Sequence, residues 1–200
     1  MNKNVRRSCI FVAIILFSFA FGFLFDKACA AVEMKKHPTD PAYTQYVMKY
    51  AEEYGTDPAL ILAVIKTASS FQNGLISDEG KIGYMQLNEQ QFSFVRDSIL
   101  KRSQEDVGLI YHPEKNIEYG VAYYSYLSAE YSNTEMTLAA YFAGPDTVAR
   151  WAAESGLDKS GYVLERIPDA KINRMVKKTM KSCKIYEKIL NKESLGHGKE

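Results

Sequence analysis

The sequence predicts a mainly α-helical protein with one folded domain. Apolar residues recur at helical spacing along most of the chain, and two Asp-Pro pairs mark helix starts. No series of alternating strands, internal repeat or low-complexity run is present. The chain of 200 residues is 46% hydrophobic and 24% charged, which is typical of a globular domain with a sizeable core.

The N-terminal residues 1–30 predict a secretory signal peptide. Basic residues precede an uncharged apolar run over residues 9–25, and the small residues Ala28 and Ala30 follow it, which predicts cleavage after Ala30. The run of about 17 residues is at the short limit for a membrane span, so an uncleaved anchor is the alternative. We therefore expect an exported protein in the cell envelope or outside the cell, with membrane contact only through an uncleaved N-terminal segment.

Removal of this segment changes the charge and the cysteine count. The whole chain carries a net charge of +1, but residues 31–200 hold 21 basic and 23 acidic residues, a net of −2. This balance argues against a nucleic-acid partner, which requires a basic excess. Only Cys183 remains beyond residue 30, so no internal disulfide is expected and the domain depends on its core.

The two Asp-Pro pairs predict the first helices of the domain, because aspartate caps a helix and proline is tolerated in its first turn. One helix begins at Asp40-Pro41, after a polar linker over residues 31–40, and ends at Gly55. The next begins at Asp57-Pro58 and ends near residues 68–71. Its residues 60–65 are almost all apolar, which predicts a helix buried in the core.

Residues 72–83 are rich in Gly, Asn, Ser and Asp and predict an irregular loop or a small hairpin, after which a helix begins near Asn88. Asn116 is predicted to cap a helix that runs through Leu127, and Thr134 to cap a helix over residues 135–143.

A helix around residues 148–153 is predicted to end at Gly156, and a final helix follows Pro168 to about Leu190. Its expected apolar stripe consists of Ile172, Val176, Cys183, Tyr186 and Leu190. The predicted domain spans residues 41–192, with a polar tail over residues 193–200.

The residue types alone indicate little chemistry. His37, His112 and His197 are scattered without ligand spacing, and phosphate-binding or dinucleotide motifs are absent, so neither a metal nor a cofactor is expected. The last helix carries a basic stripe opposed by Glu187 alone. This stripe is interpreted as a solvated face, with contact to an anionic wall polymer or membrane surface as the alternative. Its residues are Lys171, Arg174, Lys177, Lys178, Lys181, Lys184, Lys188 and Lys192.

Four stretches, in order, resemble the lytic transglycosylase (SLT) domain, a goose-lysozyme-like fold that cleaves peptidoglycan glycan strands. They are residues 54–71, residues 77–87 with the pattern Ser-x-x-Gly-x-x-Gly-Tyr-Met-Gln, residues 116–120 with 139–145, and Ile167-Pro168 before the last helix. Together they cover roughly residues 41–190. The resemblance implies a single lysozyme-like helical domain with a small irregular loop or hairpin beside the substrate groove.

The resemblance also implies a mechanism and its loss. In the family one glutamate ends the second helix and protonates the glycosidic oxygen between N-acetylmuramic acid and N-acetylglucosamine. It then accepts the proton of the muramic C6 hydroxyl, which closes a 1,6-anhydro ring. Such a group needs a pKa raised by an apolar setting. Ala68 stands at this position, and an alanine methyl cannot carry a proton.

Other positions depart from the family pattern as well. Phe142 replaces an asparagine, Ala170-Lys171 replaces a Glu-Thr pair, and Met175 stands where a tyrosine faces the cleft. A deliberate knockout changes one residue, whereas a lineage freed from catalysis loses several, so these departures favour natural loss of the acid over an engineered substitution.

The remaining motif positions imply a groove. By resemblance, Tyr141 sets the group at position 68. The implied substrate-binding residues are Ser69, Gly83, Tyr84, Met85, Gln86, Phe142 and Met175. The alternative is that these residues only maintain the fold. Gly83 would then permit a tight backbone turn, Met85 would fill the core, and Gln86 would stabilise the fold. Phe142 either offers a platform to a sugar face or plugs the groove.

Three hypotheses for function follow. The leading one is a catalytically inactive domain that binds peptidoglycan strands or an envelope protein partner. The second is an active lytic transglycosylase, either with an engineered change at residue 68 or with a relocated acid, for which Glu79 is the best candidate and Glu53 and Glu89 are weaker. The third is a non-enzymatic assembly protein with a closed groove. Release of anhydro-muropeptides would distinguish the second, and sedimentation with sacculi would separate the first from the third.

Overall fold

The computed structural model describes residues 3–131, 133–155 and 167–197. The chain forms two units, Met1–Pro38 and Thr39–Glu200. The first unit contains one helix, α1 (Lys3–Lys35), so the first five residues of the predicted linker are helical. Among the described residues, we find no helix with both the length and the apolar character that crossing a membrane requires.

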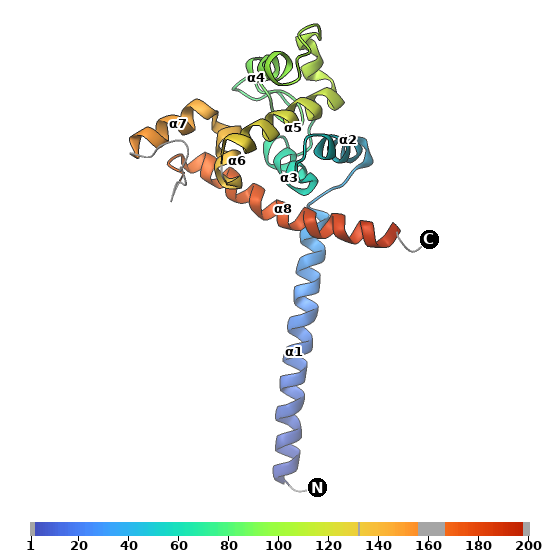
Figure 1. Cartoon of the computed structure of the whole chain (residues 1–200). Coiled ribbons are helices and arrows are strands. Elements are labelled where there is room, and N and C mark those ends of the chain that lie inside the picture. Colours follow the sequence, from blue (N-terminus) through green and yellow to red (C-terminus); the bar gives the residue numbers. More distant parts are fainter. Residues whose placement is uncertain (1–2, 132, 156–166, 198–200) are drawn as a thin grey trace. The chain divides into compact units, whose positions relative to one another are not determined.

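The second unit is built from helices (Figure 1). Its described elements confirm the predicted mainly α-helical class. They are α2 (Pro41–Glu53), α3 (Pro58–Ala68), α4 (Glu89–Phe94), a π-helical turn (Val95–Ile99), a 3-10 turn (Val107–Tyr111), α5 (Pro113–Glu130), α6 (Thr134–Ala143), α7 (Pro145–Glu154) and α8 (Ala170–His197).

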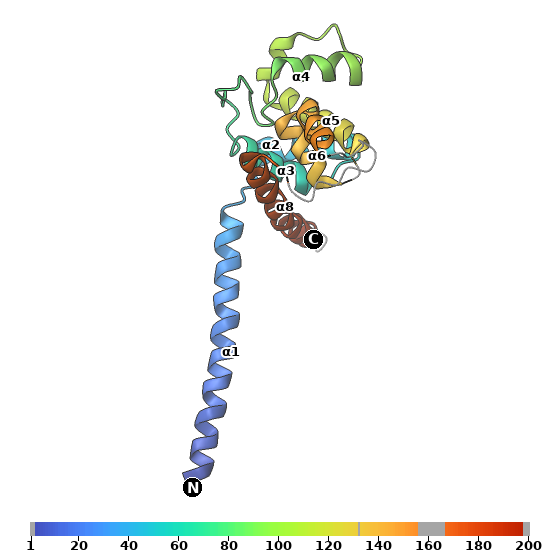
Figure 2. The same cartoon turned by 90° about the vertical axis from the view of Figure 1, so that its left-hand side faces the viewer.

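Three helices form the centre of this unit. Helices α3, α5 and α6 each contain a run of consecutive buried residues, so over these turns no side of the helix faces solvent. The runs are residues 59–65, 116–124 and 136–142. A helix that is buried on all sides must be covered by other elements. The long helix α8 packs against α3 and α6, and α2 packs against α3 and α5 (Figures 1 and 2).

The two predicted Asp-Pro helix starts are confirmed. The carboxylates of Asp40 and Asp57 each accept a hydrogen bond of 2.8 Å from the backbone N–H two residues later. Gly55 follows the end of α2 with φ +64°, a left-handed conformation that glycine adopts without steric cost. The Asp57 cap fixes where α3 begins, and the last residue of this helix is Ala68.

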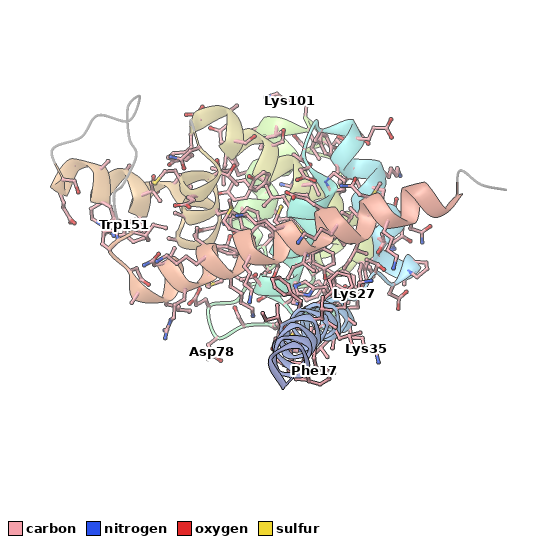
Figure 3. All side chains as sticks on the ribbon, turned by 90° about the horizontal axis from the view of Figure 1, so that it is seen from below. Phe17, Lys27, Lys35, Asp78, Lys101 and Trp151 are labelled. Carbon is pink, nitrogen blue, oxygen red and sulfur yellow. The ribbon has the colours of Figure 1, made fainter. Side chains whose placement is uncertain are left out.

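The predicted irregular loop is also confirmed. Residues 72–87 connect α3 to α4 with only isolated antiparallel bridges, between Ile76 and Ile82 and between Ile82 and Leu87. Figure 3 shows Asp78 at the outer side of this loop. The helix predicted near Asn88 begins there, because the Asn88 side chain accepts a 2.8 Å hydrogen bond from the N–H of Gln91.

Two predicted caps are wrong. Asn116 lies inside the first turn of α5, which begins at Pro113 after His112, and its side chain is fully buried instead of capping. Thr134 is the first residue of α6, and the cap is Asn133, whose side chain accepts a 2.8 Å hydrogen bond from the N–H of Met136. Asn and Thr are both acceptable helix caps, so local preference alone does not decide which residue caps the helix. At α5 the tertiary contacts of Asn116 prevent it from capping, and at α6 the neighbouring Asn133 caps in place of Thr134.

The last two described helices are longer than predicted. Helix α7 carries Trp151 (Figure 3), and the stop predicted at Gly156 lies outside the described residues. Helix α8 continues to His197, beyond the end predicted at Leu190 and into the predicted polar tail. Its stripe also differs, because Ile189 is buried and Leu190 is only half-buried, while the polar Thr179 and Ser182 are buried as well.

Candidate functional site

A cavity of about 400 Å³ lies where the C-terminal end of α3 meets the 72–87 loop, the end of α6 and the first turns of α8. It brings together seven of the residues singled out from the sequence: Ala68, Glu79, Gln86, Tyr141, Phe142, Lys171 and Met175. The other lining residues are Thr67, Ser77, Lys81, Ile172, Arg174 and Lys178. Segments far apart in the sequence therefore converge on the end of α3.

Ala68 is the last residue of α3, and the chain turns sharply after it. Ser70 and Phe71 have positive φ values of 51° and 62°, which L residues adopt rarely, so this turn carries backbone strain. Ser69 holds the turn in place, because its hydroxyl lies 2.8 Å from the carbonyl oxygen of Tyr84 and 3.1 Å from that of Ile65. This side chain is buried, and its hydroxyl ties α3 to the loop.

Asn116 fixes the loop from the other side. Its Oδ1 accepts a 2.8 Å hydrogen bond from the N–H of Met85, and its Nδ2 donates to the carbonyls of Ile82 and Ile110 at 2.9 and 3.0 Å. Gly83 passes directly over this amide with φ +77°, and a Cβ on Gly83 would lie 2.6 Å from Asn116 Cγ. Only glycine fits here, so Gly83 serves the backbone of the loop.

Met85 and Tyr84 lie beside the cavity without lining it. Met85 is fully buried against Gly120, where a Cβ would lie only 2.5 Å from the Met85 side chain. Tyr84 is half-buried, and its ring centroid lies 5.7 Å from that of Tyr43. Both residues position the loop that carries Gln86.

Gln86 and Tyr141 are polar residues of the cavity lining. Gln86 has φ +51°, and its Nε2 donates to the carbonyls of Leu75 and Gly83 at 3.1 and 2.9 Å. Its Oε1 makes no hydrogen bond to any residue that the structure describes, so it can accept one from a ligand. The Tyr141 hydroxyl donates to the Met85 carbonyl at 2.7 Å, and burial raises the pKa of Tyr141 well above its ordinary value, so the phenol stays neutral.

The charges of the cavity are mostly positive. Glu79 Oε1 lies 2.9 Å from Lys171 Nζ, and Glu79 Oε2 lies 3.9 Å from Lys81 Nζ. The hydrogen bond from Lys171 lowers the pKa of Glu79. A general acid must be protonated before the reaction, so this pairing weighs against Glu79 as a replacement acid. The weaker candidates Glu53 and Glu89 are exposed and do not line the cavity.

Among the four cations that line the cavity, Lys81 is the most withdrawn from solvent. Its side chain is 19% exposed, and its ammonium donates a 2.9 Å hydrogen bond to the Phe142 carbonyl. Burial lowers the pKa of Lys81, because the charged form loses water. No sequence pattern pointed to Lys81, and Arg174 and Lys178 were visible only as part of a helix face. Lys171 was noted there as well, as a departure from the family's Glu-Thr pair.

A second cavity of about 500 Å³ was not anticipated from the sequence. It lies between α4, the C-terminal half of α5 and the start of α7, and it includes Phe94, Tyr123 and Tyr126 with the amide side chains of Asn88 and Gln91. The residues Phe94 and Tyr126 are 38% and 39% exposed, and their ring centroids lie 5.3 Å apart at 70°. Aromatic faces with a few polar groups are typical of sites for small organic ligands, including sugars.

One group of described residues has the types of metal ligands. Asp57, Cys183 and Glu187 place ligand atoms within 4.8 Å of one another. Burial, reinforced by these carboxylates, raises the pKa of the Cys183 thiol to about 12, so the group is a protonated thiol at neutral pH. A thiol is a poor metal ligand compared with a thiolate, and we assign no metal to it.

Comparisons with known proteins place this geometry in context. Residues 45–161 match the family model described as Transglycosylase SLT domain. A membrane-bound lytic murein transglycosylase C from Pectobacterium atrosepticum is 34% identical over 119 residues, which cover 54% of this chain and 33% of that protein. The chain spans less than half the length of the curated relatives it matches.

Two solved structures are similar as well. The 70-kDa soluble lytic transglycosylase from Escherichia coli has a TM-score of 0.64 and 22% identity, over 74% of this chain and 24% of that one. An inactive mutant of lytic transglycosylase Slt from Pseudomonas aeruginosa, with one glutamate replaced by glutamine, has a TM-score of 0.62 and 26% identity. The latter match covers 75% of this chain and 24% of that one. The lysozyme-like fold implied by the sequence is thereby confirmed.

Proposed function

Because the chain belongs to the transglycosylase SLT domain family, we propose that it binds the glycan strands of peptidoglycan in the cell envelope and does not cleave them. One observation carries the proposal: the residue that ends α3 at the cavity is Ala68, where the family pattern has its glutamate. The lytic activity named for the relatives requires a group that gives and then takes a proton, and a methyl group does neither.

The other groups around the cavity support the absence of catalysis. Among its described lining residues, Glu79 is the sole carboxylate, and its contacts with Lys171 and Lys81 keep it ionised. Tyr141 is a neutral phenol already hydrogen-bonded to Met85. In the related lytic transglycosylase Slt, a mutant in which one glutamate is replaced by glutamine is described as inactive. Loss of a general acid typically lowers the rate on the order of 10²–10⁴.

Binding is supported by what the two cavities retain. Gln86 offers a free amide oxygen in the first cavity, and the half-exposed rings of Phe94 and Tyr126 offer apolar faces in the second. A pyranose ring presents apolar C–H faces and equatorial hydroxyl groups, so a sugar matches aromatic faces flanked by amide side chains. We therefore assign the two cavities to one glycan-binding surface.

Incubation of the full chain with purified sacculi tests this proposal. We expect the protein to sediment with the sacculi, and mass spectrometry to find no 1,6-anhydro-muropeptides above the level in buffer. Tyr126→Ala should weaken sedimentation by about 10-fold, because one stacking ring is worth roughly 1–1.5 kcal/mol. Tyr46→Ala, which removes a half-exposed ring of α2 outside both cavities, is the matched control.

Each part of the proposal has its own contradicting result. Anhydro-muropeptides released by the unmodified chain would show that an acid acts from another position. Failure to sediment would favour an assembly protein with a closed groove. An equal effect of Tyr126→Ala and Tyr46→Ala would remove the second cavity from the binding surface.

We also propose that residues 1–30 direct export and are removed, which leaves Ala31 as the mature N-terminus. N-terminal sequencing of the protein recovered from the envelope should begin at Ala31, because the small residues Ala28 and Ala30 suit the processing enzyme. Ala30→Arg should leave the segment uncleaved and serves as the matched variant. Sequencing that begins at Met1 in the unmodified protein would instead identify an N-terminal anchor.

A further inference from the structure

The first cavity has more cationic side chains than its own carboxylate can neutralise. Lys171 and Lys81 share the single carboxylate of Glu79. Arg174 and Lys178 line the same cavity and make no hydrogen bond or ion pair with any described residue. The lining therefore carries four positive charges against one negative charge. Like charges that converge on one concave surface raise its potential and attract an anion.

Helix geometry explains why three of these cations meet. Lys171, Arg174 and Lys178 stand at positions i, i+3 and i+7 of α8, so they share one face along about 10 Å of the helix. Met175 on this face and Ile172 on the adjoining buried face also line the cavity. The surface thus combines a row of cations with an apolar patch, and it suits an anionic group attached to an alkyl or sugar body.

Lys81 adds a partly withdrawn charge from the 72–87 loop. Of its three N–H donors, one reaches the Phe142 carbonyl, and the nearest Glu79 oxygen lies at the long distance of 3.9 Å. A half-buried ammonium is stabilised by an additional acceptor, because it has lost part of its hydration. An anion in the cavity would supply that acceptor.

We propose that this cavity binds a carboxylate of the peptide side chains of peptidoglycan, through Arg174 and Lys178 from α8 and Lys81 from the loop. The inference rests on the proposed function, since it names the part of the strand that the first cavity recognises. A guanidinium matches a carboxylate with two parallel N–H donors, and a planar carboxylate with an adjoining methyl or methylene fits beside Met175 and Ile172. The room that a glutamate side chain would take at the end of α3 is left to the ligand's own carboxylate.

Calorimetric titration of the full chain with a muramyl peptide that has free carboxylates tests this inference. We expect binding that is at least 10-fold tighter than binding of the same peptide with its carboxylates amidated, because charge-assisted hydrogen bonds are lost. Arg174→Gln should abolish most of this preference. Lys177→Gln removes the same charge from an exposed position of α8 outside the cavity, and it should leave the preference intact.

The possible outcomes separate the inference from the proposed function. If sacculi still bind but the free and amidated peptides bind equally, the inference is overturned and the function stands. The same holds if Lys177→Gln and Arg174→Gln weaken binding equally, because the effect is then general electrostatics. If a glycerol phosphate polymer binds with the dependence on Arg174 and the muramyl peptide does not, the ligand is a wall phosphate and the inference is wrong. If sacculi do not bind at all, the proposed function itself fails.

Discussion

Replacement of Asn116 by alanine is expected to lower the free energy of unfolding by about 3–5 kcal/mol, an unusually large effect for one polar residue. This side chain is fully buried and makes three hydrogen bonds, to the backbone of Ile82, Met85 and Ile110. Each bond contributes on the order of 1 kcal/mol, and buried backbone groups left without partners add a desolvation cost. Urea unfolding followed by circular dichroism measures the change.

The same substitution at Asn133 is the control. Asn133 caps α6 through one hydrogen bond to the N–H of Met136, so Asn133→Ala should cost only about 1 kcal/mol. Asn116→Ala should also weaken the binding of sacculi, because the Met85 carbonyl accepts the hydrogen bond of Tyr141, a residue that lines the cavity. Equal destabilisation by the two variants would mean that the loop keeps its conformation without the Asn116 amide.

The prediction of Asn116 as a cap shows what sequence reasoning can and cannot supply. An asparagine close after Pro113 is a reasonable helix cap, because its side chain suits the first turn. Its actual partners, at Ile82 and Met85, lie more than 30 residues away in the sequence, and local preference contains no information on such pairs. Gly83 shows the same limit. A glycine at position 83 predicts a special backbone conformation. The structural reason why only glycine fits is the side-chain amide of Asn116, which lies against it.

The helix starts at Asp40 and Asp57 were predictable because their signals are local. A carboxylate that accepts the hydrogen bond of a first-turn N–H needs only neighbouring residues. The convergence of Ala68, Gln86 and Tyr141 on one cavity came from resemblance to a family, since no spacing rule joins positions so far apart. The structure adds to it the positions of these side chains around a common volume.

The basic residues of α8 illustrate the opposite case. Their periodicity was visible in the sequence and was interpreted as a solvated face. Lys177 fits that interpretation, because it is exposed and lies outside the cavity. Lys171, Arg174 and Lys178 are exposed as well, but they also line the cavity beside the loop and the end of α3, because α8 packs against that helix. Charge and periodicity identify a face of a helix, but tertiary packing decides what the face contacts.

These cations also determine what happens when a carboxyl group is restored at the end of α3. We expect Ala68→Glu to show almost no release of anhydro-muropeptides at pH 7. An ordinary glutamate has a pKa of about 4.3, and the cations Lys81, Lys171, Arg174 and Lys178 around the cavity should hold the introduced carboxyl at or below that value. At pH 7 at most about 0.2% of it is then protonated.

The activity of Ala68→Glu should increase as the pH falls. The acid form is the reactive one, so product release by Ala68→Glu should rise about tenfold for each unit that the pH falls between 7 and 5. Addition of Arg174→Gln and Lys178→Gln removes two unpaired cations and raises the pKa of the introduced carboxyl. At a saturating concentration of sacculi, where weaker binding does not limit the rate, product release at pH 7 should increase by about 10-fold or more. NMR titration of Ala68→Glu shows one carboxyl resonance that the unmodified chain lacks, and its pH dependence measures the pKa of the introduced carboxyl.

Ala68→Gln is the control for Ala68→Glu, because it has the same size and no titrating proton, and it should release no product at any pH. A neutral pH optimum for Ala68→Glu, or a carboxyl pKa near 6, would show that burial outweighs the cations and that only the acid was lost. A lowered pKa would instead mean that the cations of this cavity oppose catalysis in addition to the missing acid. Catalysis would then require changes to both, and the cavity as it stands is suited to receive a carboxylate from its ligand.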